Sequence, residues 1–461
     1  MTYRKKLIEV AMPLTEIAEA AVREKSIRHG HPSTLHLWWS RKPLAACRAV
    51  IFASLVDDPS EHLEKFPTPQ AQEQERVRLF RLMKDLMKWE NSNDQEVLAR
   101  ANIEIRKSTG ETLPTLLDPF CGGGSIPLEG QRLGLEAHGS DLNPVAVLIS
   151  KALIEIPPIF ANHAPLNPAA KPALLGDAWS GARGLAADIR YYGQWMRTQA
   201  EQRIGHLYPK VTLPPEQGGA EATVIAWLWT RTVTCPNPAC GAQMPLTSKW
   251  WLSKKKGKEA WAEPIIDQTV TPPTISYVVK TGKGQPQYGT VNRQGATCIA
   301  CSSSVPFEHV RSEGKAGCMG AQLMAIVAEG HKGRVYLAPN EEHITAAANA
   351  YPTNVPESPL PEQALGFRIQ AYGITKYRDL FTSRQLVALT TFSDLVQEAR
   401  DLVQADATSA GLLADSVALR DGGQGAQAYA EAVATYLALA IDRLADRNSA
   451  ICSWDISRDS T

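Results

Sequence analysis

Apolar residues recur at helical spacing in five stretches of the chain. These stretches are residues 3–28, 44–55, 76–108, 180–206 and 427–447. Because side chains three or four positions apart share one face of a helix, this spacing predicts helices there, of which the one at 44–55 is apolar. Residues 56–75 are rich in Asp, Pro and Gln, and we expect a loop. Both ends of the chain are therefore predicted to be mainly helical.

The pattern changes between residues 208 and 345. Pro, Gly, Thr and Val become frequent, and strand-like runs occur at residues 222–234, 246–252, 274–280 and 333–338. Short runs of β-branched and aromatic residues bounded by turn residues are typical of strands. We therefore predict a small β-rich insert within an otherwise helical chain.

A strand, a glycine turn and a helix follow one another from residue 115. The apolar run 115–117 precedes Asp-Pro-Phe-Cys-Gly-Gly-Gly-Ser at residues 118–125, and an apolar-periodic segment comes next. Glycines allow a tight turn and close approach of a ligand, as at the start of a nucleotide-binding βαβ unit. A second short strand, 136–140, ends at Asp141, which is 23 residues after Asp118. An acidic residue at about this spacing meets ribose hydroxyls in such units.

Length and composition extend this pattern to a domain plan. The 461 residues suggest about two to four domains, and 44% apolar residues can form buried cores. We predict a helical region at 1–112, the nucleotide-binding unit and its following helix at 113–206, the β-rich insert at 207–345 and C-terminal helices at 346–461. The predicted fold class is α/β, with a Rossmann-like core.

The charge distribution points to one segment near the N-terminus. Lys plus Arg and Asp plus Glu both number 48, so the net charge neither favours nor excludes nucleic acid. Residues 1–50 nevertheless carry nine Lys or Arg against four Glu. Within them, Trp38, Trp39, Arg41 and Lys42 are candidate nucleic-acid contacts, because aromatic rings stack on bases and cations pair with phosphates. The alternative is a packed aromatic corner with solvated charges.

The sequence contains no pattern for a membrane or a secretory signal. No run approaches the roughly 18 apolar residues that a membrane span needs. The N-terminus lacks the continuous apolar core of a signal peptide. We therefore expect a cytoplasmic protein without a membrane partner, whose eight cysteines are thiols or metal ligands.

Four of the cysteines form two close pairs. Cys235 and Cys240 flank Pro-Asn-Pro-Ala, and Cys298 and Cys301 flank Ile-Ala. Two such knuckles can present four thiolates to a tetrahedral Zn²⁺ ion in a closed, structural site. The 57 residues between the pairs require an inserted lobe. The alternatives are unrelated buried cysteines, or Cys318 as a replacement ligand.

The order of the motifs resembles a known family. Asp-Pro-Phe-Cys-Gly-Gly-Gly-Ser at 118–125 and Ser-Asp-Leu-Asn-Pro at 140–144 resemble the S-adenosylmethionine site of amino-methyltransferases. With residues 31–44, the cysteine knuckles and Tyr-Arg-Asp-Leu-Phe-Thr at 377–382, the chain looks like the adenine-specific DNA methylases that contain a zinc ribbon. The resemblance implies a class I methyltransferase core, DNA adenine as acceptor, and a setting in restriction-modification or phage defence.

The resemblance also implies roles for individual residues. Asp118 would orient the methionine end of S-adenosylmethionine, Phe120 would line its pocket, and Asp141 would bind ribose hydroxyls. The implied cofactor-binding set is Asp118, Phe120, Gly122, Gly124, Asp141 and Asn143.

The chain departs from the family at the catalytic loop. Family members hold the target amine with Asp/Asn-Pro-Pro-Tyr/Phe, through hydrogen bonds and stacking on a flipped base. The Pro-Pro pairs at 157–158, 214–215 and 272–273 have neither the acidic or amide residue before them nor an aromatic residue after them. We therefore expect the cofactor-binding N-terminal half of a split or truncated enzyme, with an incomplete sheet and no catalytic residues of its own. A second polypeptide would carry the missing loop.

Two other functions remain open. The chain could be a non-catalytic, zinc-containing subunit that binds DNA or acts as a scaffold. Alternatively, Asp-Pro-Phe-Cys-Gly-x-Gly also resembles RNA guanine amino-methyltransferases, although no RNA-binding module of theirs is recognisable near the N-terminus.

Overall fold

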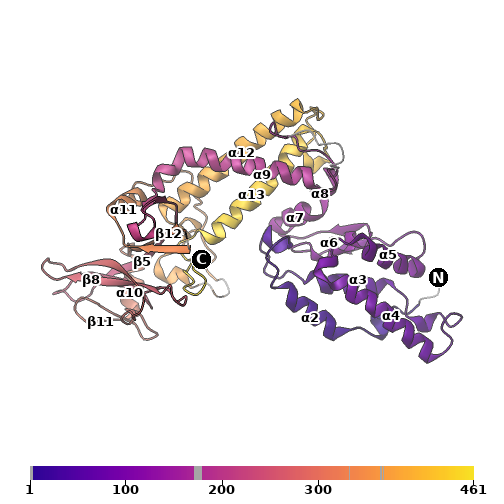
Figure 1. Ribbon diagram of the computed structural model, residues 1–461, viewed down its shortest axis with the longest axis horizontal. Helices are drawn as coiled ribbons and strands as arrows, with labels where there is room; N and C mark the ends of the chain where they lie inside the picture. Colours follow the sequence, from indigo (N-terminus) through magenta and orange to yellow (C-terminus); the bar gives the residue numbers. More distant parts are fainter. Residues whose placement is uncertain (1–3, 171–178, 332, 364–365, 367, 461) are drawn as a thin grey trace. The chain divides into compact units, whose positions relative to one another are not determined.

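The computed structural model describes residues 4–170, 179–331, 333–363, 366 and 368–460. The chain forms two compact units (Figure 1). Unit 1 comprises Met1–Gln194 and Val396–Arg443, and unit 2 comprises Trp195–Leu395 and Leu444–Thr461. The predicted boundaries at 112, 206 and 345 remain predictions.

Unit 1 begins with a group of helices. They are α1 (Leu7–Val10), α2 (Leu14–Glu24), α3 (Leu44–Leu55), α4 (Pro69–Met87) and α5 (Gln95–Thr109). The expected single helix over 3–28 is wrong, because Pro13 lacks a backbone N–H and disfavours helical geometry in the residue before it. The expected loop over 56–75 is shorter than predicted. It ends at Thr68, whose hydroxyl accepts a hydrogen bond from Ala71 N and caps α4.

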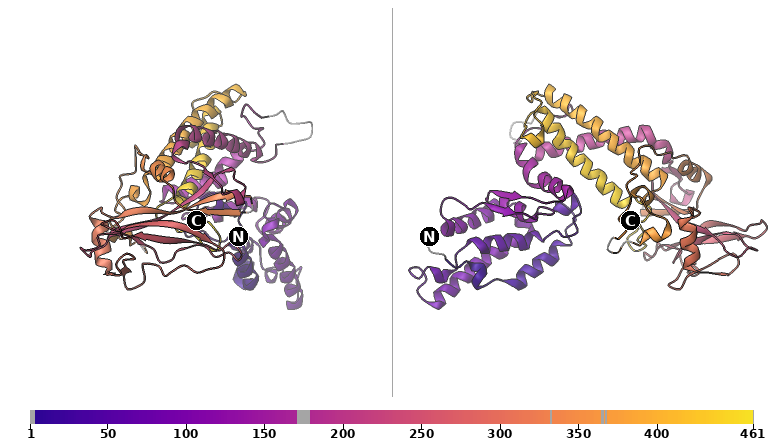
Figure 2. Two further views of the ribbon diagram at one scale, coloured as in Figure 1. Left: turned by 60° about the vertical axis from the view of Figure 1, so that its left-hand side comes forward. Right: turned by 180° about the vertical axis from the view of Figure 1, so that it is seen from behind.

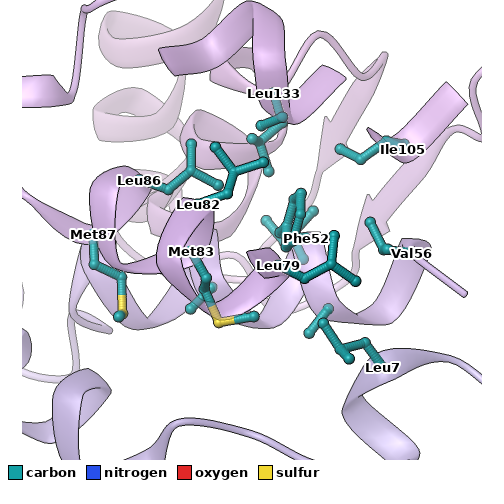
Figure 3. Packing of buried hydrophobic residues seen from close by; sticks show 14 of the residues in the cluster. Leu7, Phe52, Val56, Leu79, Leu82, Met83, Leu86, Met87, Ile105 and Leu133 are labelled. Atoms are coloured by element: carbon teal, nitrogen blue, oxygen red, sulfur yellow. The ribbon is translucent and has the colours of Figure 1, made fainter. Parts of the chain in front are cut away.

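Helix α3 lies at the centre of the N-terminal core. Its Phe52 is fully buried among Leu79, Met83 and Leu86 of α4 and side chains from α1 and α5 (Figure 3). Arg48 of the same helix is also buried, and its Nε donates to Glu129 Oε2. A buried charge is tolerated when its partner supplies hydrogen bonds, so this pair joins α3 to the next part of the unit.

A βαβ unit follows the helices. Its elements are β1 (Leu116–Asp118), α6 (Ser125–Arg132) and β2 (Ala137–Gly139), and then α7 (Pro144–Ser150) and α8 (Ile156–Ile159). The predicted strand, helix and strand are confirmed, and β1 and β2 pair in parallel with Leu116 opposite Ala137. Leu116 packs against the N-terminal core, whereas Leu117, on the opposite face, is 69% exposed. A larger Rossmann-like core built on these two strands remains a prediction.

Three long helices contribute residues to both units. They are α9 (Arg183–Ile204), α12 (Ser383–Ser409) and α13 (Ala426–Arg447), which lie side by side in both figures (Figures 1 and 2). Within unit 1, Tyr192 of α9 donates to Asp406 of α12 at 2.9 Å, and Tyr429 of α13 donates to Asp188 of α9 at 2.5 Å. Among the helices of the described residues, none has the length and apolar character of a membrane crossing.

The two larger sheets among the described residues of unit 2 are antiparallel. The four-stranded sheet has the order β13 (Gly333–Leu337), β12 (Gly320–Gly330), β5 (Val224–Thr234) and β6 (Gln243–Leu246). The three-stranded sheet consists of β7 (Trp251–Ser253), β8 (Ala260–Asp267) and β9 (Thr274–Thr281). The predicted strand over 246–252 is wrong, because it joins the end of β6 to the start of β7, which belong to different sheets.

Smaller elements complete unit 2. The two short ladders are β3 (Val211–Thr212) with β4 (Glu221–Ala222), and β10 (Ala296–Thr297) with β11 (Ser304–Val305). The described part of the unit also contains the short α-helices α10 (Phe307–Lys315) and α11 (Glu341–Ala348).

Replacing the central side chain of the N-terminal core tests this packing. Phe52→Ala should lower the free energy of unfolding of unit 1 by about 3–5 kcal/mol, because it removes a fully buried ring. The control, Val50→Ala on the same helix, removes a side chain that is 43% exposed and should cost at most about 0.5 kcal/mol. Urea unfolding followed by circular dichroism measures both, and equal losses would contradict the described core.

Candidate functional site

The glycine loop connects the end of β1 to the start of α6. Gly122 and Gly124 have φ angles of 50° and 73°, a left-handed backbone that favours glycine over other residues. Gly124 N donates to Cys121 O at 2.8 Å, and Cys121 N donates to Ser140 O at 3.0 Å. The loop is thus closed on itself and attached to the segment after β2.

Acidic and amide side chains at the ends of the two strands hold the loop in place. Asp141 Oδ2 accepts a hydrogen bond from Gly122 N at 2.9 Å, and Asp141 Oδ1 accepts one from Asn143 N at 2.9 Å. Backbone hydrogen bonds from Asn143 and Gly122 lower the pKa of Asp141 below its usual value. Asn143 Oδ1 in turn accepts from Val145 N and caps α7, while Asp118 Oδ1 accepts from Phe120 N.

Large apolar side chains stand exposed beside this loop. Phe120 is 82% exposed and Leu142 is 98% exposed. The backbone N–H of Phe120 itself donates to Asp118, and Leu142 precedes Asn143, whose backbone N–H donates to Asp141. Exposed apolar side chains next to an ordered polar loop are typical of a ligand or partner surface.

The aromatic and basic segment predicted to contact nucleic acid packs partly on the glycine loop. A Cβ added to Gly122 would lie 2.6 Å from Trp38 Nε1, and one added to Gly123 would lie 2.8 Å from Arg41 Cζ. Arg41 Nη1 donates to Gly123 O at 2.6 Å. By contrast, Trp39 is 84% exposed and stacks on Trp38 with 4.5 Å between ring centroids, and Lys42 is exposed.

Several polar atoms at this contact are buried without partners. Trp38 Nε1, Arg41 Nε and Ser125 Oγ, at the start of α6, have no hydrogen-bond partner among the described residues. Buried polar groups are nearly always hydrogen-bonded, so three of them around one glycine loop favour a polar ligand there. The sequence did not indicate that Trp38 and Arg41 meet residues 122–124, because 80 or so residues of helix and loop separate them.

Glu24 positions the segment that carries Trp38 and Arg41. Its carboxylate accepts hydrogen bonds from Leu44 N at 2.9 Å and Ala45 N at 3.0 Å, and pairs with His31 Nε2 at 2.9 Å. Burial opposes the charge of Glu24, but the hydrogen bonds from His31, Ala45 and Leu44 outweigh burial and lower its pKa. Glu24 thereby fixes both ends of the segment.

The four predicted cysteines form one cluster in unit 2. The sulfur atoms of Cys235, Cys240, Cys298 and Cys301 all lie within 4.8 Å of one another. Cys235 Sγ lies 3.6 Å from Cys301 Sγ, and Cys240 Sγ lies 3.9 Å from Cys298 Sγ. The first pair lies in the turn between β5 and β6, and the second in the turn between β10 and β11. Cys318, the alternative ligand, is exposed and lies outside this cluster.

The thiols of the cluster have unequal environments. Burial raises the pKa of Cys235 and of Cys298. The hydrogen bond with the Ser303 hydroxyl lowers the pKa of Cys301 to about 6. Four sulfur atoms at these distances can bind a metal ion, and the burial of three of them leaves little room for a further ligand.

Comparisons with known proteins match parts of the chain. Residues 11–82 match a family described as a protein of unknown function, DUF1156. This range contains Glu24, Trp38 and Arg41. A type II methyltransferase of Kocuria varians, M.MvaI, is 40% identical over 55 residues, which are 12% of this chain and 12% of that protein. No solved structure matches.

Removing the charge of Glu24 tests its positioning role. Glu24→Gln should reduce the stability of unit 1 at neutral pH by about 1–3 kcal/mol, because buried N–H groups lose a charged acceptor. Since the pKa of Glu24 is lowered in the folded state, its contribution is fully present above the ordinary value of 4.5 and is lost as the pH falls through the lowered value.

The difference between the native protein and Glu24→Gln should therefore shrink in acid, measured by urea unfolding across this pH range. Glu19→Gln is the matched control, because Glu19 is exposed on the same helix. A difference that does not change with pH would contradict the role of the carboxylate.

Proposed function

We propose that this chain carries the S-adenosylmethionine-binding part of a DNA amino-methyltransferase, with adenine as the base that the sequence resemblance favours. The observation that carries this proposal is the hydrogen bond from Gly122 N to Asp141, which holds a glycine loop at the carboxyl end of β1. Ligands of open α/β sheets bind at this edge. The partial similarity to a type II methyltransferase supports the same class of reaction.

The polar groups at the loop suit the methionine end and the ribose of S-adenosylmethionine. The unpaired Nε of Arg41 and the nearby Trp38 Nε1 suit the carboxylate of the methionine moiety. Asp118 has one carboxylate oxygen without a described partner and suits its ammonium group. Each oxygen of Asp141 accepts one backbone N–H and has a second lone pair for a ribose hydroxyl.

The apolar residues at the same edge fit the adenine ring of the cofactor. Phe120 and Leu142 present exposed apolar surface beside the two carboxylates. The space that a side chain at Gly122 or Gly124 would need is filled by Trp38 and Ser150, so these two glycines allow the loop to pack closely against its neighbours. When bound, S-adenosylmethionine would supply a methyl group on a sulfonium, and the residues of this chain would bind and orient it, which is where most of the rate of such a transfer arises.

The acceptor amine needs a second set of residues. The sequence holds no Asp/Asn-Pro-Pro-aromatic loop, and its Pro157-Pro158 pair lies within α8. We propose that a second polypeptide supplies this loop and covers the exposed face of the two-stranded sheet, where Leu117 is 69% exposed. Parallel sheets are normally covered on both faces, so this open face suits a partner.

We also propose that the four clustered cysteines hold a structural Zn²⁺ ion. Two knuckles at the ends of the β5–β6 and β10–β11 hairpins supply four sulfur ligands, the set that Zn²⁺ takes in structural sites. The ion would connect the β5–β6 hairpin to the β10–β11 hairpin, between which the three strands β7–β9 lie in the sequence.

A non-catalytic, DNA-binding subunit is the second candidate. The missing loop favours it, and exposed Trp39 and Lys42 could contact a strand. Salt-dependent DNA affinity of the native chain without any heat of S-adenosylmethionine binding would favour this candidate over the first.

Cofactor binding can be measured directly. Isothermal titration of the native chain with S-adenosylmethionine should show saturable binding. Arg41→Gln should weaken it by about tenfold to a hundredfold, because a charged hydrogen bond to the carboxylate is lost. Lys42→Gln is the matched control, since the adjacent side chain is exposed and should leave the affinity unchanged. Absence of binding by the native chain, or equal losses in both variants, would contradict the proposed site.

Metal analysis tests the cysteine cluster. The purified native chain should contain one equivalent of Zn²⁺, and Cys240→Ser should lose most of it together with several kcal/mol of stability of unit 2. Cys318→Ser, which changes an exposed thiol outside the cluster, should retain the metal. Less than half an equivalent in the native chain, with all four thiols freely titratable, would rule out the zinc site.

A further inference from the structure

Unit 2 contains a second candidate binding site, on one face of the four-stranded sheet. A pocket of about 660 Å³ lies there, bounded by β5, by α11, by the start of α12 and by Ser449, Ala450 and Cys452. Alternate residues of β5 point to the same face, so Trp227, Trp229 and Arg231 all line this pocket. The volume lies within the range of about 300–1,000 Å³ that small-molecule sites occupy.

Arg384 of α12 is a buried cation at this pocket. It is 7% exposed, and its guanidinium lies 4.1 Å from the centroid of the Trp227 ring and 5.1 Å from that of Tyr208. Its Nη1 donates to Leu207 O at 3.2 Å. These contacts orient the guanidinium but provide no negative charge.

Arg231 of β5 is a second cation in the same pocket. It is half-buried, and its Nη1 contacts the sulfur of Met319 at 3.8 Å. Within the part of the chain that the structure describes, neither Arg231 nor Arg384 forms an ion pair with a carboxylate. Burial lowers the pKa of both.

Asp379 also lines the pocket, but its carboxylate already accepts hydrogen bonds from two backbone N–H groups. Its Oδ2 accepts hydrogen bonds from Thr375 N at 2.9 Å and from Lys376 N at 2.8 Å. Buried charges are normally paired, because an unpaired one loses hydration without compensation. The two arginines therefore leave an excess of positive charge that an anion would compensate.

The N-terminus of α12 adds to this positive potential. Gln385 N donates to Thr382 Oγ1 at 3.3 Å, and Thr382 N donates to Gln385 Oε1 at 2.9 Å, so the two residues cap the helix reciprocally. Ser383 and Arg384 occupy the first turn and line the pocket. Backbone N–H groups of a first turn have no acceptor within the helix and favour a bound anion.

Trp229 supplies an aromatic surface beside these charges. It is half-buried and lines the pocket next to Arg231, whereas Trp227 is covered by Arg384. Cations beside a helix N-terminus suit a phosphate, and an accessible indole suits a base. We propose that this pocket binds a nucleoside phosphate, either as one nucleotide of a DNA strand or as a free nucleotide. The site lies in unit 2 and does not involve the glycine loop of unit 1.

Affinity measurements on the full chain test the site. Three probes are titrated separately: a short oligothymidylate, deoxyadenosine 5′-monophosphate and inorganic phosphate. Arg231→Gln and Trp229→Leu should each weaken nucleotide binding by about tenfold, because one removes a charged hydrogen bond and the other a stacking surface. Arg334→Gln, which changes an exposed arginine of β13 in the same sheet, is the control and should bind as the native chain does.

Arg384→Lys is added because a larger change at Arg384 could unfold the unit. It keeps the charge but loses the planar contact with Trp227, and it should weaken binding while leaving circular dichroism unchanged. If the oligothymidylate binds and its affinity falls in the variants, the proposal is supported and the bound nucleotide belongs to a DNA strand. If the mononucleotide binds and its affinity falls in the variants, the proposal is supported and the ligand is a free nucleotide.

Three results would overturn the proposal: no nucleotide binds, nucleotide affinity is unchanged in both Arg231→Gln and Trp229→Leu, or inorganic phosphate binds as tightly as the nucleotides. Loss of S-adenosylmethionine binding in Arg41→Gln concerns only the glycine loop. The two sites can therefore fail or succeed independently.

Discussion

The candidate site depends on the hydrogen bond between Gly122 N and the carboxylate of Asp141. It joins the turn after the first strand to the turn after the second. Trp38 and Arg41 then pack on this closed loop, and Glu24 fixes the segment that carries them. Because these hydrogen bonds already hold the loop, it would lose little conformational entropy on binding a ligand.

The local elements of the site could be predicted from the sequence, because they depend on short-range rules. Glycines at left-handed positions, an apolar strand and a helix after Pro144 all appear where the pattern predicts them. The contact of Trp38 and Arg41 with residues 122–124 could not be predicted, because no periodicity relates segments so far apart. The orphaned nitrogen atoms of those two side chains are visible only once the packing is known.

In the β-rich region, too, local signals were predicted from the sequence, whereas some of the strands were not. The two cysteine pairs are local signals, and their convergence agrees with the expectation from their spacing. The strands β8 and β12 were missed, although β12 pairs with both β5 and β13 at the centre of its sheet. A central strand is apolar on both faces, so β12 lacks the alternation that identifies a strand with one exposed face, and its run resembles a buried helix.

A shared electrostatic feature connects the two candidate sites. Arg41 in unit 1 is half-buried and Arg384 in unit 2 is buried. Burial lowers the pKa of each, although the charge of Glu24 partly offsets this effect at Arg41. Neither has a carboxylate within ion-pairing distance among the described residues, although buried arginines elsewhere in the chain, such as Arg48, have one. A guanidinium that is buried without a counterion destabilises the folded chain unless a ligand supplies the negative charge. Under the two proposals made above, each site would retain this electrostatic cost in order to bind an anion, which would be the cofactor carboxylate in unit 1 and a nucleotide phosphate in unit 2.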